Sequence, residues 1–192
     1  MFTKNIKFKN FITKKKSKNI KILRNFIKNK SLLKNYPLLK SLTNKFEYSF
    51  QKKKIKSFKK YQEVNLIGMG GSILGAEAIY DFLKYKVNKK FSFYNNLQIK
   101  RVPKTNKKNI NLVISKSGNT LETVSNFNLL LQSQKKNKNV ILCEKKNNFL
   151  SLLAKKLKAE ILEHKNYIGG RYSVFSETGM LPAELMGLNE KK

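Results

Sequence analysis

From about residue 62 onward, short runs of apolar residues alternate with stretches in which apolar positions recur at helical spacing. The expected strands are 64–67, 91–94, 110–114, 140–143 and 160–162, and the expected helices are 73–85, 120–132 and 149–157. Strands that alternate with helices at short spacing are typical of a parallel sheet covered on both faces. Because crossovers between parallel strands are right-handed, the pattern predicts an α/β fold, a doubly wound parallel sheet in an αβα sandwich.

The first 60 residues have a different texture, rich in lysine and asparagine and without glycine. Apolar residues recur there at helical spacing, at Ile20, Leu23 and Ile27, and again at Leu38, Leu42 and Phe46. Pro37 separates these two stretches, and a third short helix is expected through Ile55 and Phe58. We therefore expect a helical N-terminal extension, 1–60, with its first 15 residues disordered, packed on an α/β domain, 61–192, that includes the start of a following segment.

The charge of the chain narrows the possible partners. Lysine and arginine total 42 against 11 acids, a formal net charge of +31, which attracts nucleic acid or another acidic surface. Bases are read mainly by arginine forks, but only Arg24, Arg101 and Arg171 are arginines, and no zinc-finger, RNP or homeodomain pattern is present. We interpret the scattered lysines as a solvated surface with weak attraction for phosphate. A protein that binds nucleic acid through this charge stays a third hypothesis, after the two functions considered below.

The scarcity of reactive side chains excludes several classes of site. Cys143, His164 and Asp81 are the single cysteine, histidine and aspartate of the chain. One cysteine forms no internal disulfide, Cys143 and His164 alone cannot complete a zinc site, and the spacing of His164 and Asp81 does not support a Ser-His-Asp triad. No apolar run approaches the roughly 18–20 residues of a membrane span, and the N-terminus lacks the apolar centre of a secretory signal. We therefore expect a cytoplasmic protein with no metal and no membrane partner.

Two glycine- and serine-bearing loops follow expected strands and precede expected helices. They are Gly68-Met69-Gly70-Gly71-Ser72 and Ser115-Lys116-Ser117-Gly118-Asn119-Thr120. Such loops lie at the carboxyl edge of an open α/β sheet, where a helix N-terminus favours an anion. Glycines allow close approach of the backbone, the hydroxyl groups donate hydrogen bonds and Lys116 adds a positive charge. One such loop alone is equally well explained as a capped turn, but two in the same role favour a shared phosphate monoester.

Other glycine-loop sites fail on spacing. A P-loop needs Lys-Ser/Thr after its last glycine, but Gly75 is followed by Ala76. A dinucleotide fingerprint that begins at Gly68 needs a glycine at the position of Ile73, and asparagines stand where its ribose-binding acid is expected. These departures disfavour ATP and NAD, so we expect no cofactor.

A third motif, Gly169-Gly170-Arg171-Tyr172-Ser173-Val174-Phe175-Ser176, follows the last expected strand. The two glycines let the chain turn sharply and place an arginine. Arg171 is the best single candidate for stabilising negative charge, because a guanidinium is always ionised. The alternative is an ion pair between Arg171 and a nearby carboxylate, Glu177 or Glu184.

Together the three motifs closely resemble the glucose-6-phosphate isomerase family over about residues 60–188. The motifs are Gly68-Met69-Gly70-Gly71-Ser72-Ile73-Leu74-Gly75, then Ser115-Lys116-Ser117-Gly118-Asn119-Thr120-Leu121-Glu122-Thr123, and then Gly169-Gly170-Arg171-Tyr172-Ser173-Val174. The first two motifs are shared widely among sugar-isomerase (SIS) domains, whereas the third is specific to this family. The resemblance implies a SIS-type domain.

The resemblance further implies an aldose–ketose isomerase of glycolysis and gluconeogenesis that interconverts glucose 6-phosphate and fructose 6-phosphate without metal or cofactor. Arg171 matches the arginine that stabilises the cis-enediolate as a proton moves between C2 and C1. The substrate-binding positions it implies are Gly70, Gly71, Ser72, Ser115, Lys116, Ser117, Gly118, Asn119, Thr120 and Gly170.

The match omits the family's catalytic glutamate and its ring-opening histidine and lysine, because His164, Glu177 and Glu184 do not lie in those motifs. We therefore expect a truncated or split N-terminal portion that binds a sugar phosphate weakly and turns over little or not at all. Activity could return with a complementary C-terminal chain, and a homodimer is a further possible assembly. The alternative function is a non-catalytic SIS module that binds or senses a phosphosugar.

Overall fold

The computed structural model describes residues 21–22, 24–25, 28, 35–43, 46–58, 60–97, 109–134 and 136–188. The chain divides into two compact units, 1–40 and 41–192. In the first unit the described residues between 21 and 28 are helical. The 3-10 helix η1, Pro37–Leu42, spans the boundary and begins at the proline that separates the two apolar patterns. The expected disorder of the first 15 residues lies outside the described residues.

The second unit is built on a five-stranded sheet in which every neighbouring pair of strands is parallel. Its strands are β1 (Glu63–Gly68), β2 (Lys90–Tyr94), β3 (Ile110–Ile114), β4 (Lys138–Cys143) and β5 (Glu160–Glu163). The strand order is β2-β1-β3-β4-β5, so the order reverses between β1 and β3. This is the doubly wound α/β class that the sequence predicts, and ligands bind such sheets outside the carboxyl ends of the strands at the reversal.

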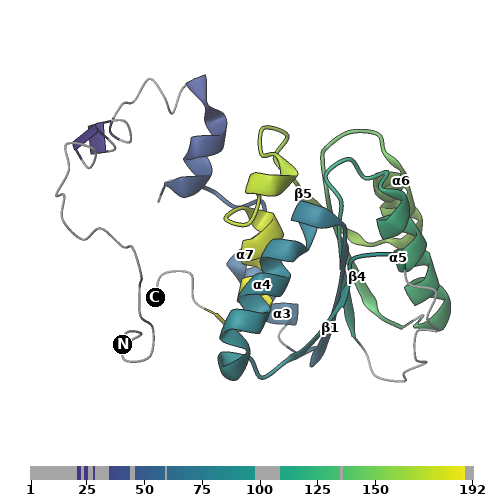
Figure 1. Ribbon diagram of the computed structural model, residues 1–192. Helices are drawn as coiled ribbons and strands as arrows, with labels where there is room; N and C mark the ends of the chain where they lie inside the picture. The colour runs from purple at the N-terminus through teal and green to yellow at the C-terminus, as the bar shows by residue number, and fades with distance from the viewer. Residues whose placement is uncertain are drawn as a thin grey trace. The chain divides into compact units, whose positions relative to one another are not determined.

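Helices cover both faces of the sheet (Figure 1). One face carries α3 (Lys52–Phe58), α4 (Leu74–Leu83) and α7 (Glu177–Leu185), and the other carries α5 (Leu121–Ser133) and α6 (Phe149–Leu157). Short 3-10 turns η2 (Gly70–Ser72), η3 (Lys84–Lys86) and η4 (Gly170–Tyr172) complete the unit. In the described part of the chain, no helix combines the length and apolarity needed to cross a membrane.

Two apolar clusters, one on each face, form the core. Leu66 and Leu112 of the strands pack with residues of α3, α4 and α7, whereas Ile67, Val113 and Phe127 pack on the opposite face with α6. Neighbouring residues of a strand point to opposite faces, so the near-continuous apolar runs of β1 and β3 fill both clusters. Buried apolar runs without alternation are therefore the sequence signal that specified this sheet.

The segment before β1 contributes to the same core. Phe50, Ile55 and Phe58 are all buried in the cluster that contains α4 and α7, and the Tyr48 ring stacks on Phe50 with their centroids 4.9 Å apart. The division of the chain into two units falls between residues 40 and 41. The domain boundary at residue 60, drawn from the change in composition, stays a prediction.

A row of asparagines crosses the sheet near the amino ends of its strands. Asn65, Asn111 and Asn139 lie opposite one another in the register of β1, β3 and β4. Asn65 Nδ2 donates to Asn111 Oδ1 at 2.8 Å, and Asn111 Nδ2 donates to Asn139 Oδ1 at 2.9 Å. Gln134 and Asn137 complete the network through side-chain hydrogen bonds. These amides, all buried except the half-buried Asn139, bond one another and fix the strand register at the end of the sheet opposite the candidate site.

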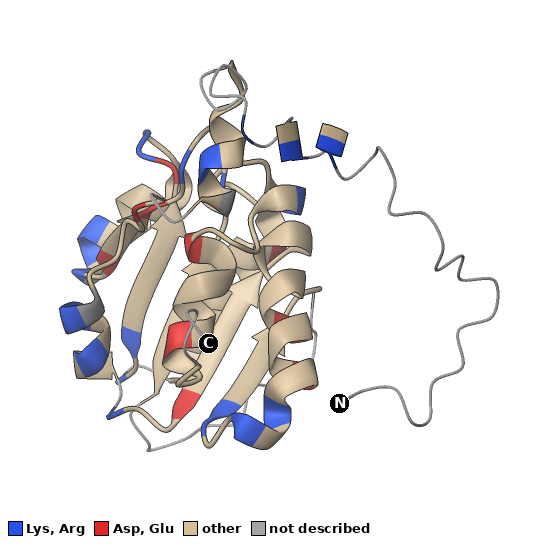
Figure 2. Ribbon diagram, turned by 90° about the vertical axis from the view of Figure 1, so that its left-hand side faces the viewer, with Lys and Arg blue, Asp and Glu red and all other residues tan. Residues whose placement is uncertain are grey.

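Basic residues are spread over several helices and loop ends (Figure 2). Some pair with the few acids: Lys54 Nζ lies 2.9 Å from Glu160 Oε1, and Lys145 Nζ lies 3.0 Å from Glu163 Oε2. The lysine run 52–54 begins α3, and the run 14–16 lies outside the described residues.

Candidate functional site

The first and second loops leave the sheet side by side. β1 and β3 are parallel neighbours, with Gly68 opposite Ile114 at their carboxyl ends. A β-carbon on Gly68 would lie 3.1 Å from Ile114 O, so the two strand ends approach closely. Both loops therefore open at the same edge of the sheet, at the point where the strand order reverses.

The first loop turns sharply from β1 into α4. Gly70 has φ +55°, a left-handed conformation that favours glycine, and η2 leads through Ile73 into the helix. Gly71 is needed for a different reason, because a β-carbon there would lie 2.1 Å from Gly170 O. Ser72 is buried beneath the turn. The sequence analysis attributed the glycines of this loop to close approach by a ligand. At Gly71 the group that approaches closely is the backbone of the third motif, at Gly170.

Hydroxyl groups organise the second loop. The Ser115 and Thr120 hydroxyls share a hydrogen bond of 2.9 Å, and Gly118 N donates to Ser115 Oγ at 3.2 Å. Ser115 is buried, whereas Ser117 is exposed and its Oγ accepts from Asn119 N at 3.2 Å. Of the three hydroxyls predicted from the sequence, that of Ser115 shapes the loop from within, and those of Ser117 and Thr120 lie nearer the solvent.

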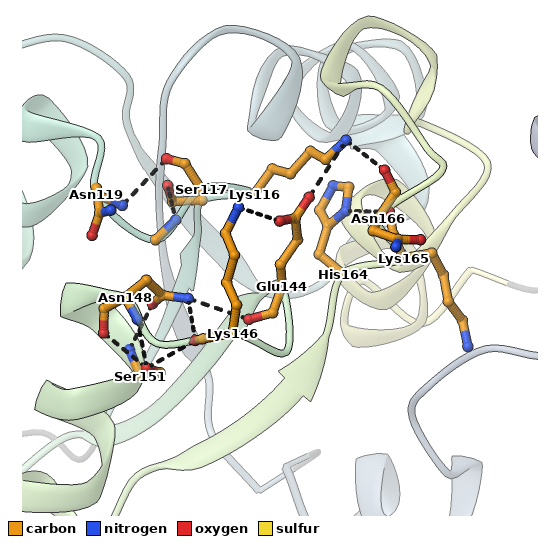
Figure 3. Close-up of polar contacts among 12 residues, drawn as sticks. Lys116, Ser117, Asn119, Glu144, Lys146, Asn148, Ser151, His164, Lys165 and Asn166 are labelled. Carbon is orange, nitrogen blue, oxygen red and sulfur yellow. Dashed lines mark hydrogen bonds and ion pairs between the residues drawn. The ribbon is translucent and has the colours of Figure 1, made fainter.

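The second loop is braced against the start of α6. Gly118 has φ +70°, and a β-carbon there would lie 2.0 Å from Asn148 Oδ1. Leu150 N donates to Gly118 O at 3.0 Å, and Phe149 N donates to Asn119 Oδ1 at 2.8 Å. Asn148 caps α6 in a capping box with Ser151, visible in Figure 3. The loop is thus held in shape without a ligand.

The N-termini of α4 and α5 carry no side-chain cap. Ile73 and Thr120 occupy the N-cap positions, and neither makes a side-chain capping hydrogen bond. Side-chain capping is the ordinary way to satisfy first-turn N–H groups. The explanation of these loops as simply capped turns therefore does not hold at either helix, and both N-termini can bind an anion.

The third motif packs on the first. Ser173 Oγ is within hydrogen-bond distance of both Gly71 O (3.2 Å) and Gly170 O (2.7 Å). A β-carbon on Gly75 would lie 2.8 Å from Val174 Cγ2, so α4 also needs a glycine where it meets this motif. The structure thus places the turn that carries Arg171 directly against the Gly70–Ser72 turn.

Arg171 is exposed, and among the described residues it forms no ion pair. The pairing with Glu177 considered from the sequence is not formed, because Glu177 is buried and its Oε1 accepts from Ser49 N at 2.8 Å. Burial raises the pKa of the Glu177 carboxyl. The backbone of Arg171 therefore lies beside the first loop, and its side chain is exposed without an ion-pair partner among the described residues.

The Lys116 ammonium has partners of its own. Lys116 Nζ donates to Asn166 O at 2.8 Å and lies 3.6 Å from Glu144 Oε1. Figure 3 shows the side chain extending away from Ser117 toward these two groups. Lys146 Nζ pairs with Glu144 Oε2, and this hydrogen bond is the main reason that the pKa of Glu144 is lowered. The structure brings the backbone of Lys116 into the loop but not its charge.

His164 was left outside every motif, yet it is buried below this lysine (Figure 3). Its Nδ1 lies 3.1 Å from Lys165 O, and because a carbonyl can only accept, Nδ1 carries the proton. Nε2 is buried without a hydrogen-bond partner, and burial lowers the pKa of the imidazole. The one sequence signal was its place just after a strand. No group of three or more His, Cys, Asp or Glu suited to a metal ion occurs among the described residues.

Solved structures with this fold include proteins of different kinds. A hypothetical protein of Thermus thermophilus superposes with a TM-score of 0.64 at 20% identity, covering 88% of this chain and 43% of that one. The NanR protein of Vibrio vulnificus, complexed with ManNAc-6P, gives a TM-score of 0.54 at 16% identity over 90% of this chain and 62% of its own. Tagatose-6-phosphate ketose/aldose isomerase from Escherichia coli gives 0.50 at 14% identity, over 83% of this chain and 44% of its own. At these identities the likeness confirms the fold alone.

Sequence comparison is more specific. Glucose-6-phosphate isomerase of Methanocaldococcus jannaschii is 35% identical over 72% of this chain and 36% of its own length. The corresponding values are 32%, 69% and 35% for the Mycoplasmoides gallisepticum enzyme, and 30%, 81% and 41% for that of Campylobacter jejuni. The chain thus spans about a third of the length of the curated relatives that it matches. The family profile described as phosphoglucose isomerase matches residues 33–190, and the chain belongs to this family.

Proposed function

We propose that this chain grips the phosphate of a hexose phosphate between its first and second loops, as part of an aldose–ketose isomerase that interconverts glucose 6-phosphate and fructose 6-phosphate. The observation that carries the proposal is the pair of uncapped helix N-termini, of α4 and α5, at one edge of adjacent strands. Two helix N-termini favour a doubly charged monoester more than a neutral sugar. Membership of the phosphoglucose isomerase family supports the choice of reaction.

The second loop supplies the hydroxyl donors of this grip. Ser117 and Thr120 carry the outer hydroxyls, and the backbone N–H group of Lys116 lies in the same turn. The N–H groups of Gly118 and Asn119 donate within the loop and hold its shape. Ser115 supports the turn from below through Thr120 and Gly118. Charge-assisted hydrogen bonds to phosphate are about twice as strong as neutral ones, so a few well-placed donors hold the group firmly.

The first and third motifs form the other side of the proposed sugar-phosphate site. Gly70, Gly71 and Ser72 present the start of α4, and Gly170 packs on Gly71 to bring Arg171 beside them. In the proposed reaction a base moves a proton between C2 and C1 through a cis-enediolate that bears negative charge. Arg171 stabilises that charge, because its guanidinium is unpaired among the described residues and a fixed cation is most effective where charge develops.

The base itself lies outside the three motifs. Glu177 is buried with one oxygen bonded to Ser49 N, so it does not suit this role. We therefore propose that the chain alone binds the sugar phosphate but turns it over weakly, and that a complementary C-terminal chain supplies the base and the ring-opening groups. A non-catalytic module that only binds or senses a phosphosugar is the second candidate, because the three motifs supply a grip on phosphate but no base.

Calorimetric titration of this chain with fructose 6-phosphate tests the grip. The double variant Ser117→Ala/Thr120→Ala should weaken binding by about tenfold or more, because it removes two donors to a charged group. The matched control is Ser133→Ala, which removes a hydroxyl at the far end of α5 that bonds only backbone carbonyls. Binding that persists unchanged in the double variant would refute the proposed loop.

A coupled assay for fructose 6-phosphate formation separates the two candidate functions. The chain is assayed alone and together with a C-terminal chain from a relative. Turnover that appears only in the mixture supports the isomerase, whereas tight binding without turnover in either sample supports the non-catalytic module. DNA binding tighter than micromolar at physiological salt would instead favour the basic nucleic-acid binder.

A further inference from the structure

We propose that the side chain of Lys116 is a positioning group: it fastens the segment that carries Arg171 to the second loop, and Glu144 holds it in place. The proposal rests on the function above for its catalytic meaning, but its geometry stands independently. In this proposal the Lys116 ammonium binds Asn166 O and Glu144. The phosphate is bound by the backbone and hydroxyls of the second loop.

One side chain joins three loops at the carboxyl edge of the sheet. Lys116 follows β3, Glu144 follows β4 and Asn166 follows β5. Glu144 N donates to Lys116 O at 3.1 Å, so the first two loops are already tied through their backbones. The Lys116 ammonium then passes Glu144 Oε1 at 3.6 Å to reach Asn166 O at 2.8 Å (Figure 3).

From Asn166 the chain runs straight into the arginine turn. The turn around Asn166 is closed by Ile168 N, which donates to Lys165 O at 3.1 Å, and the Ile168 side chain is fully buried. Tyr172 N then closes the next turn on Gly169 O at 2.9 Å. Beyond it, Ser173 Oγ is within hydrogen-bond distance of Gly71 O. The segment before and after Arg171 is therefore held at two points, by Lys116 on one side and by the first loop on the other.

The charges at this junction fit a Lys116 ammonium that stays in one place. Glu144 has a side chain only 13% exposed and lies between two ammonium groups, those of Lys116 and Lys146. Without its negative charge these two lysines would lose the carboxylate that they share. His164 lies beneath the junction and does not bind the lysine, since its Nε2 has no hydrogen-bond partner and its Nδ1 bonds Lys165 O.

A lysine that binds phosphate directly would respond in the opposite way when Glu144 is neutralised. If the Lys116 ammonium leaves Glu144 to bind phosphate, neutralising Glu144 frees it and tightens binding. If the ammonium is a fastening, neutralising Glu144 loosens the Arg171 segment and weakens binding. The sign of the Glu144→Gln effect therefore separates the two roles.

The first measurement is amide hydrogen exchange of the ligand-free chain, read at Ile168 and Tyr172 with the β3 amide of Leu112 as internal reference. Lys116→Met and Glu144→Gln should each speed exchange at both turn amides by about tenfold while the Leu112 amide is unchanged. Lys116→Arg should restore slow exchange, since a guanidinium also donates to a carbonyl. Lys145→Met, which removes the neighbouring pair with Glu163, is the matched control and should change neither turn amide.

The second measurement is affinity for fructose 6-phosphate. Glu144→Gln and Lys116→Met should each weaken binding by about three- to tenfold, and the double variant should be no weaker than Lys116→Met, because both changes break one linkage. Tighter binding in Glu144→Gln, or exchange at Ile168 and Tyr172 that stays at the parent rate, would overturn the positioning role. If the parent chain binds no sugar phosphate, the proposed function fails while the exchange result still decides the linkage.

Discussion

The carbonyl oxygen of Gly170 lies 2.1 Å from the position that a β-carbon on Gly71 would occupy. The two residues are far apart in sequence, and each belongs to a different motif of the candidate site. Their contact explains why a glycine is needed at residue 71 even without a ligand. It also makes the position of Arg171, the next residue after Gly170, depend on the shape of the first loop.

Gly71→Ala should therefore destabilise the fold and displace the arginine turn. A methyl group forced against backbone costs about 2–3 kcal/mol, which urea unfolding measures directly. The matched control is Gly170→Ala, whose added carbon meets nothing within 4 Å. Equal stability of the Gly71→Ala variant and the parent chain would show that this contact is not tight in solution.

The asparagine row gives a second prediction, this one about stability without function. Asn111 Oδ1 accepts from Asn65 and Asn137, and Asn111 Nδ2 donates to Asn139. Asn111→Ala should cost about 2–4 kcal/mol in unfolding free energy, because it removes three side-chain hydrogen bonds from a largely buried network.

Binding of fructose 6-phosphate should be unchanged in the folded Asn111→Ala variant, since Asn111 lies near the amino end of β3. Asn139→Ala, which loses a single hydrogen bond at a half-buried position, is the graded control and should cost less. A large loss of affinity at unchanged stability would contradict this separation of the two ends of the sheet.

His164 predicts a pH dependence of stability. Burial lowers the pKa of its imidazole below the ordinary 6.5, so the unfolded chain takes up a proton at a higher pH than the folded chain. Stability from this group is therefore complete above about pH 6.5 and declines as the pH falls from there through the folded pKa. Lys116 acts on the imidazole as a cation and Glu144 as an anion, whereas Lys165 acts through its backbone carbonyl.

His164→Leu should remove that part of the acid sensitivity. Urea unfolding at pH 7.5 and at pH 5.0 measures it as the difference between variant and parent, which cancels contributions from other groups. The parent chain should lose more stability than the variant between these two values. An identical loss in both would show that His164 keeps its ordinary pKa in the folded chain.

Arg171 gives a prediction about catalysis. In a preparation that turns over, Arg171→Ala should lower kcat by about a hundredfold or more with little change in KM, because the charge it stabilises develops in the transition state. Arg171→Lys should recover part of the rate, since it keeps the cation but loses the planar fork. A rise in KM alone would mean that Arg171 only binds substrate.

Much of the fold was predictable because the sheet is buried on both faces. Strand β3, Ile110–Ile114, and helix α6, Phe149–Leu157, have the bounds expected from the sequence. Helix α4 ends at Leu83, before the predicted Tyr85, because the chain tightens into the 3-10 turn η3. Local apolar patterning sets such elements, whereas their last residues depend on the turns that follow.

The candidate site was predictable in its loops but not in its contacts. Strand–glycine–helix order placed the first and second loops at one edge, as β1 and β3 confirm. It did not show that the Lys116 ammonium reaches Asn166, or that Gly71 meets Gly170, because both contacts join segments distant in sequence. Nor did it find His164, whose burial depends on how loops after different strands pack.

Two turns are proposed to hold one phosphate, and amide chemical shifts show whether both turns take part. Nitrogen-15-labelled chain is titrated with fructose 6-phosphate, and with fructose as the control that lacks the phosphate. The amides of Gly70–Ser72 and of Lys116–Thr120 should shift together along one binding curve, and fructose should move neither group. Shifts confined to one turn, or shifts of equal size with fructose, would contradict it.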